Sequence, residues 1–107
     1  MWRVIAVCAL SLLPLAGIAG APDAARQAEL RHLLQQDCGS CHGLTMKGGL
    51  GPPLLPRDLA GKPREALLLT VRNGRPGTAM PPWGPLLSDA DIAWLVDVLL
   101  AGDAVTP

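Results

Sequence analysis

A chain of 107 residues can form one small domain but is too short for two domains of ordinary size. Its nine lysine and arginine residues equal its nine aspartate and glutamate residues, which excludes a net basic domain of the kind that binds nucleic acids. The chain has no tyrosine or phenylalanine and only three tryptophans, so few large side chains are available for a hydrophobic core. Because small domains often need more than their side chains to fold stably, we expect a large apolar cofactor to complete the core.

The first 20 residues predict an export signal that is removed from the mature protein. One arginine precedes an apolar run over residues 4–16, and small residues follow it. The run is shorter than the roughly 20 residues of a membrane-spanning helix, and Pro14 interrupts it. We therefore expect cleavage at about residues 19–21, loss of Cys8 with the signal, and a periplasmic domain over residues 21–107 without a membrane span.

Three segments of the mature domain have the apolar spacing of amphipathic helices. They cover residues 23–37, 62–72 and 88–101. Ser88 and Asp91 open the last segment in a capping pattern, and Gly74 follows the second segment as a stop. The connections are rich in glycine and proline, and nothing alternates as a strand does. The pattern predicts an all-α fold of three to four helices. Loops this long are unusual in a compact domain unless they are functional, so we expect them to line a binding site.

The sequence Cys38-Gly39-Ser40-Cys41-His42 is the pattern of covalent haem attachment. Two thiols three positions apart lie on one side of a helical turn, so both can reach the vinyl groups on one edge of a porphyrin. The adjacent imidazole of His42 can then reach the iron. We predict one haem c, bound through Cys38 and Cys41 with His42 as an axial ligand.

Other readings of this motif have less support. A structural zinc site needs four ligands, usually with a second Cys or His pair, and the mature chain has only Cys38, Cys41, His42 and His32 to offer. A thioredoxin-like dithiol needs a surrounding sheet, which the pattern does not predict. A plain disulfide leaves the following histidine and the thin core unexplained.

The second axial ligand has three candidates. His32 is on the polar side of the first predicted helix, where an exposed side chain is expected. Met46 is four residues beyond His42, and a segment of that length spans only about 14 Å, too little to pass round the porphyrin and return to the iron. Met80 is far enough along the chain, in a Gly/Pro loop, so we predict His/Met ligation, which raises the reduction potential of haem iron.

Further motifs follow the attachment site in the order found in class I bacterial cytochromes c, and the resemblance covers essentially the whole mature chain. They are Gly51-Pro52-Pro53-Leu54, Val71-Arg72-Asn73-Gly74, Ala79-Met80-Pro81-Pro82 and the helix predicted over residues 88–100. The resemblance implies a small class I cytochrome c fold wrapped around one haem. It also implies that the Pro52 carbonyl accepts a hydrogen bond from His42, which fixes the plane of the ligand, and that Leu54 packs on the haem.

A narrower resemblance involves residues 36–44, 48–52, 61–63 and 74–83. They are similar to the small monohaem cytochrome encoded alongside the haem-c/haem-d nitrite reductase of denitrifying bacteria. This similarity implies a periplasmic carrier of single electrons between redox proteins, not an enzyme, with nitrite reductase as a partner; we also expect a monomer. One alternative is an accessory factor in maturation of the reductase haem d. Another is a haem enzyme or gas sensor, which would need an open axial position where Met80 is expected.

Charge is distributed unevenly along the chain, although it balances in total. Six basic residues lie at positions 47 to 75, and every charged residue after position 78 is acidic. The basic residues are Lys47, Arg57, Lys62, Arg64, Arg72 and Arg75. We expect them to ring the exposed haem edge and to give the domain a dipole that steers it toward an acidic partner.

Overall fold

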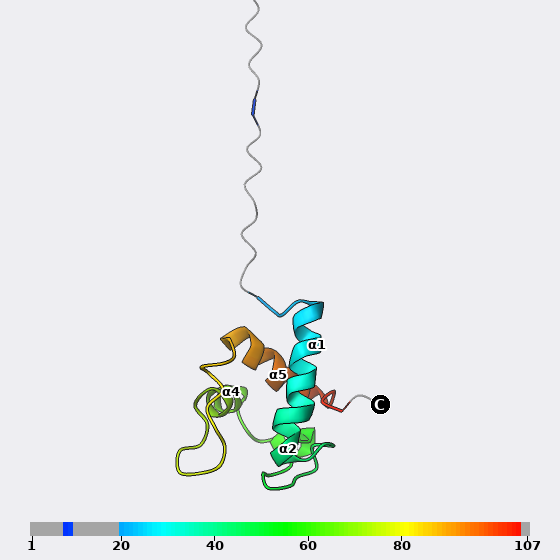
Figure 1. The fold of residues 1–107 in the computed structure, drawn as a ribbon, viewed down its shortest axis with the longest axis vertical. Helices are drawn as coiled ribbons and strands as arrows, with labels where there is room; N and C mark the ends of the chain where they lie inside the picture. Colours follow the sequence, from blue (N-terminus) through cyan, green and yellow to red (C-terminus); the bar gives the residue numbers. More distant parts are fainter. Residues whose placement is uncertain (1–7, 10–19, 106–107) are drawn as a thin grey trace, which may run out of the picture.

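The computed structural model describes residues 8–9 and 20–105, so the predicted export signal lies almost entirely outside the described part of the chain. The elements are α1 (Ala24–Leu33), the π-helix η1 (Leu34–Cys38), α2 (Gly39–His42), α3 (Pro56–Leu59), α4 (Arg64–Asn73) and α5 (Asp89–Ala101). These residues contain no strand, which confirms the predicted all-α fold. Figure 1 shows α5 crossing behind α1 and two long loops, green and yellow, at the end of the molecule away from residue 20.

The first helical run is longer than predicted and carries the attachment motif at its end. Asp23 caps α1 by accepting a hydrogen bond from the backbone N–H of Arg26 at 2.8 Å. The helix then continues without a break through η1 and α2 as far as His42. Gly43 ends it with a φ of 91°, and a Cβ there would lie 2.7 Å from the carbonyl oxygen of Gly48. Only glycine fits this turn.

The other two predicted helices are present, and one short helix was not predicted. Helix α5 begins after Ser88, whose hydroxyl accepts from the Asp91 N–H at 3.1 Å, as the capping pattern indicated. Helix α3 lies in the segment that we expected to be irregular. Its signal was Pro56 at the first helical position with Asp58 two residues later, where the carboxylate accepts from the Leu55 N–H at 3.0 Å.

The core forms where α1, α3 and α4 pack against α5, and Leu34 of η1 belongs to the same buried cluster. Leu30 and Leu34 are almost fully buried, as are Ile92 and Val96 from the predicted apolar face of α5. At the edge of the same contact, the guanidinium of Arg31 lies over the Trp94 ring, 5.4 Å from its centroid. None of the helices in the described part of the chain is long and apolar enough to cross a membrane.

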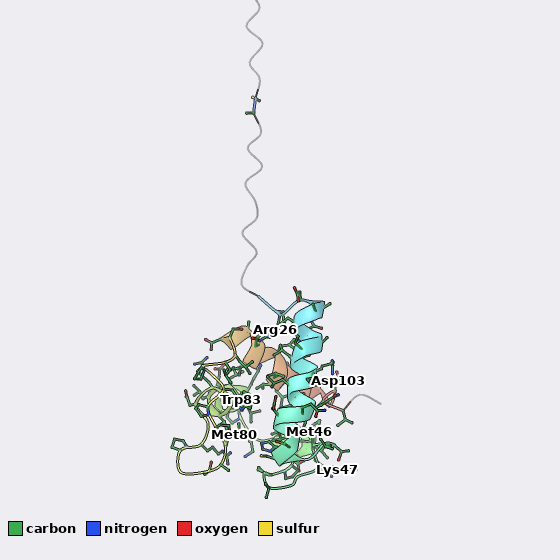
Figure 2. The ribbon with its side chains drawn as sticks, viewed as in Figure 1. Arg26, Met46, Lys47, Met80, Trp83 and Asp103 are labelled. Carbon is green, nitrogen blue, oxygen red and sulfur yellow. The ribbon has the colours of Figure 1, made fainter. Side chains whose placement is uncertain are left out.

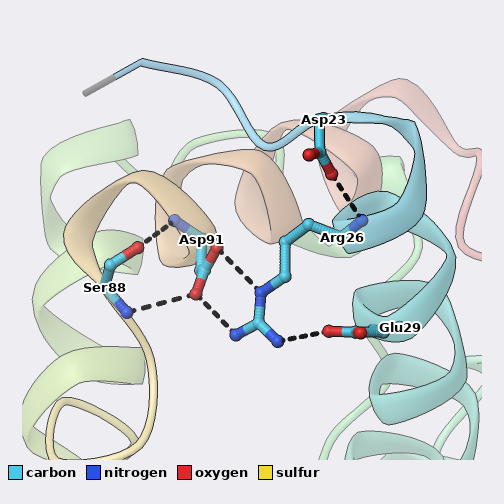
Figure 3. A network of polar contacts seen from close by, with 5 residues as sticks. All are labelled: Asp23, Arg26, Glu29, Ser88 and Asp91. Atoms are coloured by element: carbon cyan, nitrogen blue, oxygen red, sulfur yellow. Dashed lines mark hydrogen bonds and ion pairs between the residues drawn. The ribbon is translucent and has the colours of Figure 1, made fainter. Parts of the chain in front are cut away.

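A polar network ties the start of α1 to the start of α5 (Figure 3). The Arg26 guanidinium donates to Asp91 at 2.8 Å and to Glu29 at 2.7 Å, and Asp91 also accepts from the Ser88 N–H at 3.3 Å. The hydrogen bond from Arg26 is the main reason that the pKa of Asp91 lies below its usual value. Because only 11% of the Asp91 side chain is exposed, this carboxylate depends on its partners rather than on water.

We expect Asp91→Asn to lower the free energy of unfolding at pH 7 by about 1 kcal/mol. Since the folded pKa of Asp91 is below its unfolded value of about 3.9, the stabilisation is complete above pH 4 and is lost as pH falls through the folded pKa. Denaturant unfolding at several pH values checks this. Asp103→Asn serves as control, because the Asp103 carboxylate forms no hydrogen bond or ion pair within the described residues. An Asp91 difference that stays constant down to pH 3 would contradict the network.

Candidate cofactor site

A cavity of about 910 Å³ lies between the helices and the two long loops. Its volume is near the upper end of the range for cofactor sites. Every predicted cofactor-binding residue lines it: Cys38, Cys41, His42, Pro52, Leu54 and Met80. Most of the remaining wall is apolar and comes from residues that sequence reasoning did not assign to a site, including Leu33, Leu59, Leu67, Val71, Trp83, Leu95 and Leu99.

The two thiols come from the last turns of the first helical run. Cys38 and Cys41 are both half-buried and line the cavity, and no disulfide joins them. Burial, with a smaller contribution from the negative charge of Asp37, raises the pKa of the Cys38 thiol to about 11, so this thiol is protonated at neutral pH. Gly39 between them is buried, and a Cβ there would meet Leu44 at an ordinary 3.4 Å.

His42 is held on one edge of its ring by the loop that follows it. Its Nδ1 lies 2.7 Å from the carbonyl oxygen of Pro52, which is the hydrogen bond that the resemblance implied. A carbonyl oxygen can only accept, so Nδ1 carries the proton and Nε2 keeps its lone pair. Gly51 lies against the ring, because a Cβ there would come within 2.9 Å of two ring atoms. This arrangement prepares Nε2 as a metal ligand.

We expect Gly51→Ala to displace the His42 imidazole and to destabilise the holo-protein by about 1–3 kcal/mol. The reason is that the new methyl group would overlap the ring at 2.9 Å. Gly39→Ala is the matched control, since a Cβ there meets its nearest neighbour at an ordinary 3.4 Å. Thermal melting with the visible spectrum recorded in parallel measures both effects. Equal melting temperatures for the two variants would contradict the close contact.

Met80 is carried by a loop that is fastened to the end of α4. The Arg75 N–H donates to the Met80 carbonyl at 3.1 Å, and the Trp83 N–H donates to the Val71 carbonyl at 3.0 Å. Gly74, with a φ of 65°, lets the two ends of the loop come into contact, because a Cβ there would lie 2.6 Å from the Met80 carbonyl oxygen. The loop therefore holds Met80 at the cavity wall by backbone contacts.

The two rival ligand candidates lie elsewhere. Met46 is 1% exposed, belongs to the hydrophobic core and does not line the cavity. Figure 2 shows Met46 near the lower end of the first helical run, whereas Met80 lies on the side of α4. His32 is exposed on α1 and also lies outside the cavity wall. Of the three candidates, Met80 alone lines the cavity that holds His42.

The expected ring of six basic residues around the cavity is wrong. Only Lys62 and Arg75 line it. Arg64 pairs with Asp97 at 2.8 Å and Arg72 pairs with Asp89 at 2.8 Å, because α4 packs against α5. Two cations of the basic middle segment, Arg64 and Arg72, therefore pair with acidic residues of α5 across a helix contact.

Comparison with known proteins agrees with this geometry. Residues 25–98 match the family model described as cytochrome C oxidase, cbb3-type, subunit III. Cytochrome c55X of Pseudomonas aeruginosa is 64% identical, over 84% of this chain and 76% of the relative. The solved structure of the c-type cytochrome NirC is 64% identical with a TM-score of 0.77, over 79% of this chain and 100% of the other. Dihydro-heme d1 dehydrogenase NirN in complex with DHE is 36% identical with a TM-score of 0.61, over 64% of this chain but only 15% of the other.

Proposed function

Because this chain belongs to the c-type cytochromes, in the family of cytochrome c55X, we propose that it carries single electrons in the periplasm on one haem c held in this cavity. The observation that carries the proposal is the convergence of Cys38, Cys41, His42 and Met80 on one apolar cavity. These groups fit haem: two thiols for covalent attachment, an imidazole with a free Nε2 and a thioether from a separate loop.

Each residue has a distinct task in this proposal. Cys38 and Cys41 would hold the cofactor through thioether bonds, and Pro52 orients the His42 ring through the 2.7 Å hydrogen bond. Haem iron would supply one-electron chemistry. Met80 would hold the iron through its thioether, a ligand that raises the reduction potential. Because His42 and Met80 would both hold the iron, the site favours electron transfer over chemistry on a bound substrate.

Export is the second part of the proposal. The arginine, short apolar run and small residues within positions 1–21 support a cleaved signal peptide. The mass of the mature protein purified from the periplasmic fraction tests this. It should equal residues 20–107, 21–107 or 22–107 plus one haem. A full-length chain retained with membranes would contradict cleavage.

We propose the haem-c/haem-d nitrite reductase as a redox partner, on the strength of the narrower sequence resemblance. A second candidate is a role in maturing haem d, favoured by one observation: a domain similar to this chain forms 18% of the dihydro-heme d1 dehydrogenase of Pseudomonas aeruginosa, at 39% identity. Stopped-flow mixing of the holo-protein with each purified enzyme separates the two. Fast transfer to the reductase alone supports the first role, and fast transfer from the dehydrogenase alone supports the second.

We expect docking to use an apolar rim at the cavity mouth. Leu50 lines the cavity and is 94% exposed, and it lies beside the exposed Pro52 and Pro53. Leu50→Ser should weaken partner association about tenfold, as expected when one leucine is no longer buried at the contact, without changing the spectrum. Leu86→Ser is the control, since Leu86 is 73% exposed but does not line the cavity. Equal rates for the two variants would place docking on another face.

A further inference from the structure

Two arginines of α4 form ion pairs with α5, and the two pairs have different surroundings. Arg64 is the first residue of α4 and binds Asp97 at 2.8 Å, with both side chains exposed. Arg72 is next to the last residue of α4 and binds Asp89 at 2.8 Å. The Nε of Arg72 is buried and has no hydrogen-bond partner within the described part of the chain. Arg72 is therefore packed against the protein as well as paired.

The loop that carries Met80 returns to α4 at Arg72. The Gly84 N–H donates to the Arg72 carbonyl at 3.0 Å. Gly84 also lies against the Arg72 side chain, because a Cβ there would come within 2.9 Å of Arg72 Cγ. Asp89, five residues after Gly84, binds the guanidinium. Arg72 thus holds the chain at two points beyond Met80.

The segment between these two contacts is part of the cavity wall. Trp83 and Leu87 both line the cavity, and the Leu87 N–H donates to the Trp83 carbonyl at 2.9 Å. Met80 lines the same wall, separated from Trp83 only by Pro81 and Pro82. Because φ is fixed in each proline, this link is stiff, and a movement of Trp83 displaces Met80 as well.

We propose that Arg72 is a positioning residue for the Met80 ligand. Its contacts with Gly84 and Asp89 hold the loop against α4 and so keep the Met80 thioether in place at the haem iron. The proposal rests on the haem site described above. A ligand supported by packed and bonded neighbours keeps its geometry better than one on a free loop. A partly exposed ion pair adds little to overall stability, so loss of positioning can be observed in a protein that still folds.

The rate of cyanide binding to the ferric full-length holo-protein tests this, because cyanide reaches the iron only after Met80 leaves it. Arg72→Gln should bind cyanide about fivefold faster, the change expected from loss of a partly exposed ion pair. Arg64→Gln is the matched control. It removes the other ion pair between α4 and α5, at the end of α4 away from the loop, and should change the rate by less than about twofold.

A second variant removes the same ion pair from its exposed side. The Asp89 side chain is 77% exposed, so Asp89→Asn should fold and bind cyanide as fast as Arg72→Gln. The double variant should be no faster than either single variant, because the two residues act through one contact. Equal rates for Arg72→Gln and Arg64→Gln overturn the proposal, as does a wild-type rate in Asp89→Asn. Wild-type protein without a Met80–iron absorption band would instead contradict Met80 ligation itself.

Discussion

Replacing Met80 with alanine is expected to open the haem iron to cyanide or carbon monoxide. It should also lower the reduction potential by more than ~59 mV, which is a tenfold change in the equilibrium constant for one-electron reduction. Met80 lines the cavity from a loop anchored to α4, whereas His42 lines it from the end of the first helical run. Loss of its thioether removes the ligand that raises the potential. Absorption spectra with and without each small ligand, together with a redox titration, measure both effects.

Met46→Ala is the control for this experiment. Met46 is 1% exposed within the core and lies outside the cavity wall, so its truncation should destabilise the protein by about 2–5 kcal/mol while leaving the spectrum and potential unchanged. A high-spin spectrum in Met46→Ala, with Met80→Ala unaffected, would reverse the assignment of the two methionines.

The double variant Cys38→Ala with Cys41→Ala is expected to yield no stable protein. Without covalent attachment, a domain of this size must fold around an apolar cavity of about 910 Å³, and its remaining contacts cannot offset the entropy of ordering the chain. Circular dichroism and thermal melting of the purified protein measure this. Cys8→Ala is the control, since it lies in the predicted signal. A helical double variant that melts cooperatively would show that the haem is dispensable for folding.

Local patterns were enough to predict several parts of this molecule. The apolar spacing of residues 88–101 and the Ser88–Asp91 cap placed α5 to within one residue of its observed start. The reach of an extended chain favoured Met80 over Met46 as the second ligand, and Met80 is the methionine that lines the cavity. Sequence distance and side-chain chemistry suffice for both predictions.

Other parts depend on contacts between segments that are distant in sequence. The pairing of Arg72 with Asp89 follows from the packing of α4 on α5, so counting charges along the chain could not predict it. The contact of Gly51 with the His42 ring arises from a loop that returns to the helix end. The extension of the first helix to His42 runs through a π-helical turn whose residues have no apolar periodicity of their own.

A crystal structure of the purified, full-length holo-protein tests the central claim most directly. It should show one haem in the cavity of about 910 Å³, joined by thioether bonds to Cys38 and Cys41, with iron bonded to Nε2 of His42 and to the sulfur of Met80. Iron bonded to His32 or Met46, or haem bound without a bond to either cysteine, would contradict this account.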